Sequence, residues 1–329
     1  MTKRTSFETL EPNEVDNIAE MTDILRRKMD RDYAKGDTKR DAHPKTVGLL
    51  RAKFIIEADL AADLRVGIFK KAQIFECYIR TSNASGKIQS DTISDARGFA
   101  IKLMVATEKN VKGEEPLGQD FVLMSSPVMP LGTVALFRDA VYYTIESSPL
   151  WLAAKFFVTG NALVLLELLK LRISPSSPFD IRYWSTTPYL LGKNHAVKYS
   201  LLPTSKHRSN LSKKLSDSYL SDAMQKHLDK HVASFDFCVQ MQKEGMPIED
   251  ASVLWDETQS PFIKVATLQI PKQKFQTKER EELAEMLSFS PGNALPAHAA
   301  LGGLNRARIA IYKALSNFRH KRDQRENIE

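Results

Sequence analysis

The stretch Leu49-Leu50-Arg51-Ala52-Lys53-Phe54-Ile55-Ile56-Glu57 decides the fold class, because its composition and patterning are those of a β-strand. Similar stretches bounded by turn residues are expected to form strands at 72–81, 98–105, 121–124, 183–184, 197–201, 235–241 and 263–270. No helical segment separates the first four strands, as parallel crossovers would require. The pattern therefore predicts an antiparallel β-barrel with flanking helices, of the α+β class.

Helices are expected on either side of these strands. Residues 1–38 are predicted to form a helical lead-in, with Ile18, Met21, Ile24 and Leu25 at helical spacing. Further helices are expected at 278–287 and 304–319. No linker rich in Gly, Ser or Pro divides the chain, so residues 39–320 are expected to form one domain, followed by a basic tail at 321–329.

The most apolar stretch, residues 151–171, is interrupted by charge. Lys155, Glu167 and Lys170 lie within it, whereas a membrane span needs about 20 predominantly apolar residues. We therefore expect buried or substrate-channel helices here rather than a transmembrane segment, and a peripheral contact with a membrane stays open.

Composition narrows the class of protein. The 329 residues are 43% hydrophobic and 26% charged, which is typical of a globular domain. Cys77 and Cys238 are too few for a disulfide framework or a thiolate metal cluster. The polar N-terminal sequence resembles no signal peptide, so a cytoplasmic protein is expected.

The net charge of +7 does not indicate a nucleic-acid partner. Residues 306–329 hold seven basic and three acidic side chains, so this segment supplies +4 of the total. No nucleic-acid-binding motif accompanies it, and a solvated basic tail explains the charge more simply.

Two groups of residues near the first strands could carry chemistry. Arg40 and His43, the latter followed by Pro44, precede the first strand, where a histidine could be a positioned acid or base or only a surface residue. Tyr78, Arg80 and Ser82 share one face of the second strand. An arginine inside a barrel needs an anion, so this face is either solvent-exposed or directed at a negative group.

A third group lies on the last predicted helix. Arg308, Tyr312 and Arg319 are spaced by four and seven residues, which places them on one helical stripe. An arginine beside a tyrosine favours the phenolate, a hard anionic ligand for ferric iron. A basic amphipathic surface helix would show the same spacing.

Together these segments resemble the haem catalases, in the same chain order. Arg40-x-x-His43 is similar to the distal histidine segment, and Ile79-Arg80-Thr81-Ser82 to the strand with a propionate arginine. The strand Asp95-Ala96-Arg97-Gly98-Phe99-Ala100-Ile101-Lys102 resembles the family's Asp-x-Arg-Gly-Phe-Ala-x-Lys strand. Phe289-Ser290-Pro291-Gly292-Asn293 and Arg308-x-x-x-Tyr312 resemble the segment before the proximal helix and the proximal ligand motif. The matches run from about residue 40 to 320.

The resemblance implies a haem b cofactor and assigns roles to these residues. Tyr312 would be the proximal iron ligand as a phenolate kept charged by Arg308, as in catalases generally. Arg40, Arg80 and Arg319 would bind the haem carboxylates. His43 would be the distal acid–base group, oriented by Ser82.

One position departs from the family pattern. In Met124-Ser125-Ser126-Pro127, Ser125 stands where catalases have a distal asparagine, and its hydroxyl cannot reproduce the reach of an amide donor. Val128 and Met129 replace the phenylalanines that wall a catalase distal pocket. Efficient dismutation of hydrogen peroxide is therefore not expected.

The length and two segments, 119–124 and 246–251, resemble the short catalase-related branch of peroxidases and allene oxide synthases. The resulting prediction is a haem-dependent peroxidase that acts on organic, in particular fatty-acid, hydroperoxides and weakly on hydrogen peroxide. The alternatives are isomerisation by an allene oxide synthase or hydroperoxide lyase, a minimal true catalase, and a non-catalytic haem-binding protein. The sequence does not identify the natural substrate, a small-molecule reductant or the oligomeric state. A homo-oligomer is compatible with the resemblance.

Overall fold

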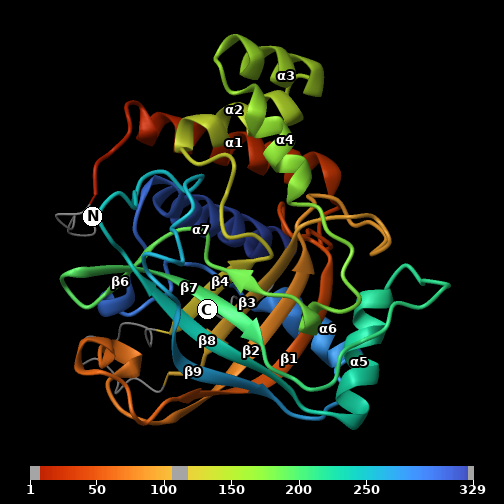
Figure 1. Cartoon of the computed structure of the whole chain (residues 1–329). Coiled ribbons are helices and arrows are strands. Elements are labelled where there is room, and N and C mark those ends of the chain that lie inside the picture. The colour runs from red at the N-terminus through yellow and green to blue at the C-terminus, as the bar shows by residue number, and fades with distance from the viewer. Residues whose placement is uncertain (1–7, 106–117, 325–329) are drawn as a thin grey trace.

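The computed structural model describes residues 8–105 and 118–324 (Figure 1). Within these residues the strands are β1 Thr46–Ile56, β2 Ile74–Asn83, β3 Arg97–Leu103, β4 Gln119–Met124, β5 Tyr183–Trp184, β6 Tyr189–Leu191, β7 His195–Pro203, β8 Ala233–Met241 and β9 Ile263–Ile270. The helices are α1 Glu14–Asp32, α2 Val134–Ile145, α3 Pro149–Val158, α4 Ala162–Lys170, α5 Tyr219–Lys230, α6 Lys278–Met286 and α7 Gly303–Asp323.

Eight of the described strands close into an antiparallel barrel. Neighbours follow the order β5-β4-β3-β2-β1-β9-β8-β7, and β5 pairs with both β4 and β7, which joins the two ends of the sheet. Strand β6 adds to the free edge of β7. The predicted α+β class with an antiparallel barrel and flanking helices is therefore confirmed, although α2, α5 and β6 were not predicted.

Aromatic side chains fill the barrel interior. The rings of Phe54, Phe121 and Phe237 lie 4.7–5.9 Å apart, centroid to centroid, and all three residues are fully buried. A small barrel of eight strands has room for side chains or one small ligand. Since aromatic rings occupy this room, a large cofactor has to bind outside the barrel wall.

The outer face of β2 is covered by helix α6. Ile79 packs into the barrel core, whereas its neighbour Tyr78 packs outside the barrel against Ala284 and Leu287. The face with Tyr78, Arg80 and Ser82 thus lies between the barrel and helices. The expectation of a solvent-exposed face is therefore wrong, because α6 and the segment before β1 bury this face from outside. The other expectation, a face directed at a negative group, stays a prediction.

Helices α1, α2 and α7 form a layer beside the barrel (Figure 1). Met21 and Leu25 of α1 pack against Val134 of α2 and against Ile311 and Leu315 of α7. These side chains recur at three- and four-residue intervals on each helix, which gives one apolar stripe per helix. The layer fixes α7, the helix with Arg308, Tyr312 and Arg319, against the barrel.

Helices α3 and α4 project from this layer as a lobe (Figure 1). Leu152 and Phe156 of α3 are buried against α2 and α4, but no residue of α4 is buried. The expectation of buried helices at 151–171 is therefore wrong for α4, because the lobe has only a narrow core of its own. The alternative of substrate-channel helices stays a prediction. No helix among the described residues is long and apolar enough to cross a membrane.

The first turn of α7 is held by acidic side chains from distant parts of the chain. The Arg306 guanidinium contacts the carboxylates of Glu8 and Glu14 at 2.6 Å and of Glu249 at 2.9 Å. Glu249 also accepts a hydrogen bond from the backbone N–H of Gly303 at 2.7 Å. Carboxylates near a helix N-terminus are favourable, so this network stabilises the start of α7.

Arg306→Leu is therefore expected to lower the free energy of unfolding by about 2 kcal/mol. Removing one partner of a buried ion pair costs about 3–5 kcal/mol, and the 22% exposure of the Arg306 side chain reduces this value. Urea denaturation measures the change. As a control, Lys278→Leu removes an exposed pair with Glu282 and should change stability by less than about 0.5 kcal/mol. If the two substitutions lowered the free energy of unfolding equally, the Arg306 network would not stabilise the start of α7.

Candidate active site

His43 and Ser82 form a hydrogen-bonded pair outside the barrel wall. The imidazole Nδ1 lies 2.9 Å from Ser82 Oγ, although the residues are 39 positions apart. His43 has a φ of 56°, in the left-handed region that non-glycine residues rarely adopt. Such strained residues are common at functional sites, because the surrounding structure has to hold them in place.

The pKa of His43 is lowered to about 3. Burial is the largest cause, followed by the positive charges of Arg80, Arg308 and Arg40. The imidazole is therefore neutral at physiological pH. With Nδ1 in the bond to Ser82, Nε2 is the nitrogen that remains for proton transfer.

Three predicted site arginines gather beside this pair. Arg80 is 5% exposed and donates to the Thr46 hydroxyl at 3.0 Å and to the backbone carbonyl of His43 at 2.6 Å. Arg40 and Arg319 each lie 3.4 Å from one oxygen of the Glu285 carboxylate. Burial, and then the charge of Arg40, lowers the pKa of Arg80 well below its usual value. A buried cation bonded to neutral groups favours an anion nearby.

Arg308 and Tyr312 meet on the same side of α7. The Arg308 guanidinium carbon lies 5.7 Å from the centroid of the Tyr312 ring, and its Nη1 donates to the Thr187 hydroxyl at 3.2 Å. Burial lowers the pKa of Arg308, but the phenols of Tyr312 and Tyr189 outweigh burial and raise it. The charge of Arg308 in turn lowers the pKa of His43, which places the arginine within electrostatic reach of the imidazole.

Gly98 of β3 has no side chain, and the His43 imidazole occupies the space beside its Cα where a side chain would lie. A Cβ at this position would lie 2.6 Å from Ser82 Oγ and 2.8 Å from Nδ1 and Cε1 of His43. A glycine inside a strand often marks a close approach of another group. The motif Asp95–Lys102 contains this glycine, and no role was predicted for it, although a glycine in an apolar strand is a signal of close approach.

Gly98→Ala should therefore displace the imidazole and slow the reaction with peroxide that the family resemblance predicts by at least about tenfold, while the fold is kept. The added methyl group cannot fit unless Ser82 or His43 moves, and a misplaced catalytic group loses rate steeply. Stopped-flow kinetics measure the rate, and circular dichroism with thermal unfolding controls for folding. An unchanged rate in a folded variant would show that His43 has no catalytic role in this position.

Ser125 lies at the end of β4, next to the strand with Gly98. Its hydroxyl accepts a hydrogen bond from the backbone N–H of Arg97 at 2.9 Å. Ser125, Val128 and Met129 are half-buried. Met129 packs against the same cluster of apolar side chains as Tyr312, so it belongs to this side of the barrel.

The segment before α7 is anchored by a buried carboxylate that sequence reasoning did not identify. Asp120 of β4 contacts Lys102 at 3.1 Å and accepts hydrogen bonds from the backbone N–H of Ser290 and the side-chain amide of Asn293. Burial is the main cause that raises the pKa of Asp120 to about 6. These contacts join the Phe289–Asn293 segment to the barrel and so help to position α7.

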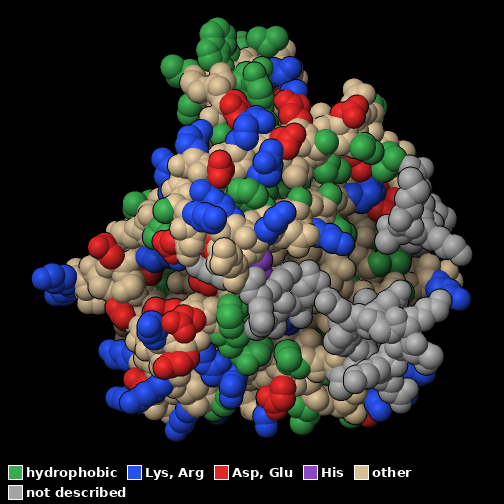
Figure 2. Space-filling view, turned by 180° about the vertical axis from the view of Figure 1, so that it is seen from behind, with side chains coloured by type: hydrophobic (Ala, Val, Ile, Leu, Met, Phe, Trp, Pro, Cys, Tyr) green, Lys and Arg blue, Asp and Glu red, His purple; other side chains and the backbone are tan. Residues whose placement is uncertain are grey.

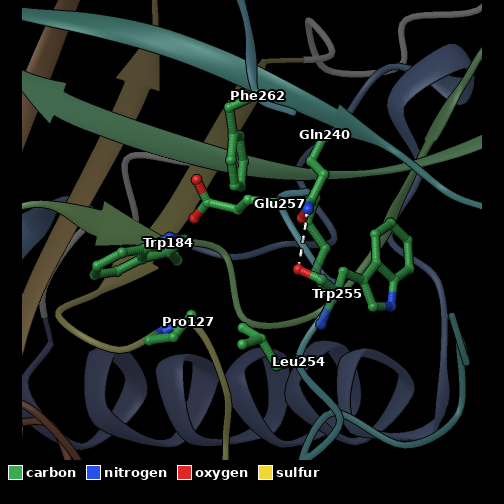
Figure 3. Close-up of a pocket in the computed structure, with 8 residues that line it drawn as sticks. Pro127, Trp184, Gln240, Leu254, Trp255, Glu257 and Phe262 are labelled. Carbon is green, nitrogen blue, oxygen red and sulfur yellow. Dashed lines mark hydrogen bonds between the residues drawn. The ribbon is translucent and has the colours of Figure 1, made fainter. Parts of the chain in front are cut away.

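A separate shallow pocket lies on another part of the barrel surface (Figure 3). It is lined by Pro127, Trp184, Lys198, Gln240, Leu254, Trp255, Glu257 and Phe262. The amide of Gln240 donates to the Trp255 carbonyl at 3.0 Å. None of the predicted site residues lines this pocket. No group of three or more His, Cys, Asp or Glu side chains in the described part of the chain is arranged to hold a metal ion.

Comparison with solved structures identifies the fold. A fungal catalase matches with a TM-score of 0.69 and 17% identity over 97% of this chain and 66% of the catalase. Catalase A from Saccharomyces cerevisiae matches with a TM-score of 0.69 and 16% identity over 97% of this chain and 68% of that protein. A bacterial catalase matches with a TM-score of 0.67 and 15% identity over 97% of this chain and 64% of that protein. The chain thus spans about two thirds of the length of these catalases. No protein-family model and no curated protein sequence matches it. The chain has the fold of the catalases.

Proposed function

We propose that this protein is a haem-dependent peroxidase of the catalase-related type that transforms organic hydroperoxides. The observation that carries the proposal is the convergence of His43, Ser82, the arginine cluster and the Arg308–Tyr312 pair outside the barrel wall. These residues come from segments more than 200 positions apart. Their convergence in a chain with the catalase fold supports a common site.

The residues present fit a haem b group. Haem b carries two carboxylates, and the buried or half-buried guanidinium groups of Arg40, Arg80 and Arg319 gather at one place beside His43 and Ser82. Arg80 is the best evidence, because its buried guanidinium donates to neutral oxygens and its pKa is lowered. A haem carboxylate would stabilise the charged form of this side chain.

Tyr312 is the residue that would hold the iron, as a phenolate stabilised by Arg308. The Arg308 guanidinium carbon lies 5.7 Å from the centroid of the ring, so a positive charge is close to the ligand position. A bound haem supplies the iron chemistry that cleaves the O–O bond of the hydroperoxide. The protein supplies orientation and electrostatics around it.

His43 would transfer the proton in this reaction. As a neutral imidazole it takes the hydroperoxide proton and returns it to the departing oxygen, while Ser82 holds the ring in place. In the peroxidase reaction, ROOH and a two-electron donor DH₂ give ROH, D and water. The O–O bond breaks and the donor is oxidised.

Ser125 is expected to make the protein a weak catalase, so kcat/KM should be higher for a long-chain hydroperoxide than for hydrogen peroxide. A serine hydroxyl is too short to place a second hydrogen peroxide as an amide does, and its bond is worth about 1 kcal/mol. Val128 and the flexible Met129 form an apolar wall that suits an acyl chain.

Ser125→Asn should shift this ratio toward hydrogen peroxide. The new oxygen can still accept the Arg97 N–H bond, and the amide nitrogen adds a donor. Ser94→Asn, on the exposed surface, is the matched control and should leave the ratio unchanged. Oxygen evolution from hydrogen peroxide near the diffusional ceiling of about 10⁸ M⁻¹s⁻¹ would instead identify a minimal true catalase.

Product analysis with one fatty-acid hydroperoxide, with and without a reducing donor, tests the reaction class. The proposal predicts an alcohol whose formation requires the donor. An epoxide or aldehyde formed without a donor would identify an isomerase or lyase. Haem binding with no turnover in either condition would identify a non-catalytic haem protein.

A further inference from the structure

The lobe formed by α3 and α4 is apolar on its outer surface as well as in its core. The side chains of Leu150, Phe157, Val158 and Leu163 are 73–84% exposed, the four highest values among the exposed large hydrophobic side chains of the described residues. Figure 2 shows green side chains covering the top of this lobe, with charged side chains gathered below it. A helix that is apolar all round belongs in an apolar medium.

The charges of this region lie toward the base of the lobe. Between residues 147 and 166 the only charged side chain is Lys155. Glu146 is paired with Arg27 of α1 at 3.0 Å, and Glu167 with Lys170 at 2.6 Å, so both flanking carboxylates are neutralised. Lys155 in turn lies 4.0 Å from the carboxylate of Asp139 in α2. The outer end of the lobe, residues 156–166, therefore carries no charged side chain.

The polar groups at the turn between α3 and α4 are bonded within the lobe. The N–H groups of Thr159, Gly160 and Asn161 donate to carbonyls of α3 at 2.7–3.2 Å. The Thr159 hydroxyl donates to the Lys155 carbonyl, and the Asn161 amide donates to Thr159. Such bonds are common at helix C-termini, and here they leave these three N–H groups satisfied without water, which is compatible with entry into lipid.

We propose that the α3–α4 lobe inserts into the surface of a lipid bilayer and anchors the protein there peripherally. Trp151, 65% exposed on the same lobe, belongs to the residue types that favour the membrane interface. Helices of 10 and 9 residues are about 15 Å and 13 Å long, which suits insertion to a depth of about 5–10 Å rather than a span. A protein partner would instead need polar groups at the contact to pair with its own.

The lobe adjoins the candidate active site. Met129 and Phe137 pack against both the core of the lobe and the cluster that contains Tyr312. An anchored lobe would thus place the active site close to the lipid surface. The inference itself uses none of the proposed haem-binding residues, so it stands or fails separately from the proposed function.

Co-sedimentation of the full-length protein with vesicles of 70% phosphatidylcholine and 30% phosphatidylglycerol tests the proposal. The wild type should bind, and the double variant Phe157→Ser/Val158→Ser should bind at least about tenfold more weakly, because two inserted apolar side chains are lost. The control Ile74→Ser/Ile88→Ser removes side chains that are 58% and 57% exposed elsewhere, and it should bind like the wild type.

Tryptophan fluorescence gives a second readout of the same event. Trp255 is 1% exposed and Trp184 is half-buried, so a blue shift on adding vesicles should come from Trp151 and be lost in Trp151→Phe. Failure of the wild type to bind, or equal binding of the Phe157/Val158 variant, would overturn the proposal. The proposal would also be overturned if the wild type formed a dimer that does not bind vesicles and that dissociates when Phe157 and Val158 are replaced. A second copy of the chain would then cover the lobe.

Discussion

His43→Ala should retain haem but react with peroxide about 10²–10⁴-fold more slowly than the wild type. This range is the usual contribution of a positioned general acid–base group. The imidazole is neutral because burial and three guanidinium groups lower its pKa to about 3, so it can accept the peroxide proton. Stopped-flow measurement of the haem spectrum after mixing with peroxide gives the rate. The exposed His231→Ala serves as the control and should react normally. A wild-type rate in His43→Ala would exclude His43 as the base.

The lowered pKa of His43 also predicts a pH dependence of stability in the haem-free protein. The unfolded chain has an ordinary histidine pKa near 6.5, whereas the folded value is about 3. Between these values the unfolded state binds a proton that the folded state does not, so His43 lowers stability as pH falls from about 6.5 to about 3. In His43→Ala this part of the decline should be absent when urea midpoints are compared over that range.

Tyr312→Phe should remove the phenolate-to-iron absorption of the ferric protein and weaken haem binding by more than about 100-fold. Substitutions that only support a metal ligand already cost about 10–100-fold in metal affinity, and this one removes the ligand. Arg308 lies 5.7 Å from the ring and stays in place to favour a negative charge that phenylalanine cannot supply. Haemin titration followed by absorbance measures both effects.

Two further variants separate ligation from packing at Tyr312. Tyr143→Phe removes the hydroxyl of another half-buried tyrosine, in the α2 helix, and should leave the spectrum unchanged. Arg308→Met keeps the phenol but removes the neighbouring cation, so an anionic ligand to the iron loses a favourable interaction and haem should bind more weakly. A spectrum that is the same in Tyr312→Phe and in the wild type would rule out Tyr312 as the iron ligand.

The strands were predictable because β-strand patterning and turn residues are local properties of the sequence. The predicted strand at 263–270 coincides with β9, and the prediction of 278–287 differs from α6 by one residue. Gly98 and Ser82 were also visible within a strand motif. The closeness of Ser82 to His43 was expected from the family resemblance and not from spacing along the chain, whereas the closeness of Gly98 to His43 was not expected.

Other features depend on contacts that no local pattern encodes. Glu285 reaches Arg40 across 245 positions, and Asp120 reaches Asn293 across 173, so only the folded chain brings them together. The solvent exposure of the outer face of β2 could not be predicted, because strand periodicity distinguishes the two faces of a strand but does not show what covers each face. The segment 151–171 was expected to be buried because it is apolar, and the fold leaves its outer side open instead.

The most direct test of the central claim is an equilibrium titration of the purified protein with haemin, followed by resonance Raman spectroscopy of the ferric complex. The proposed site predicts one haem per chain, with tyrosinate vibrations that are absent in Tyr312→Phe. A titration with no saturable stoichiometry, or a complex with histidine ligation that survives in Tyr312→Phe, would contradict it.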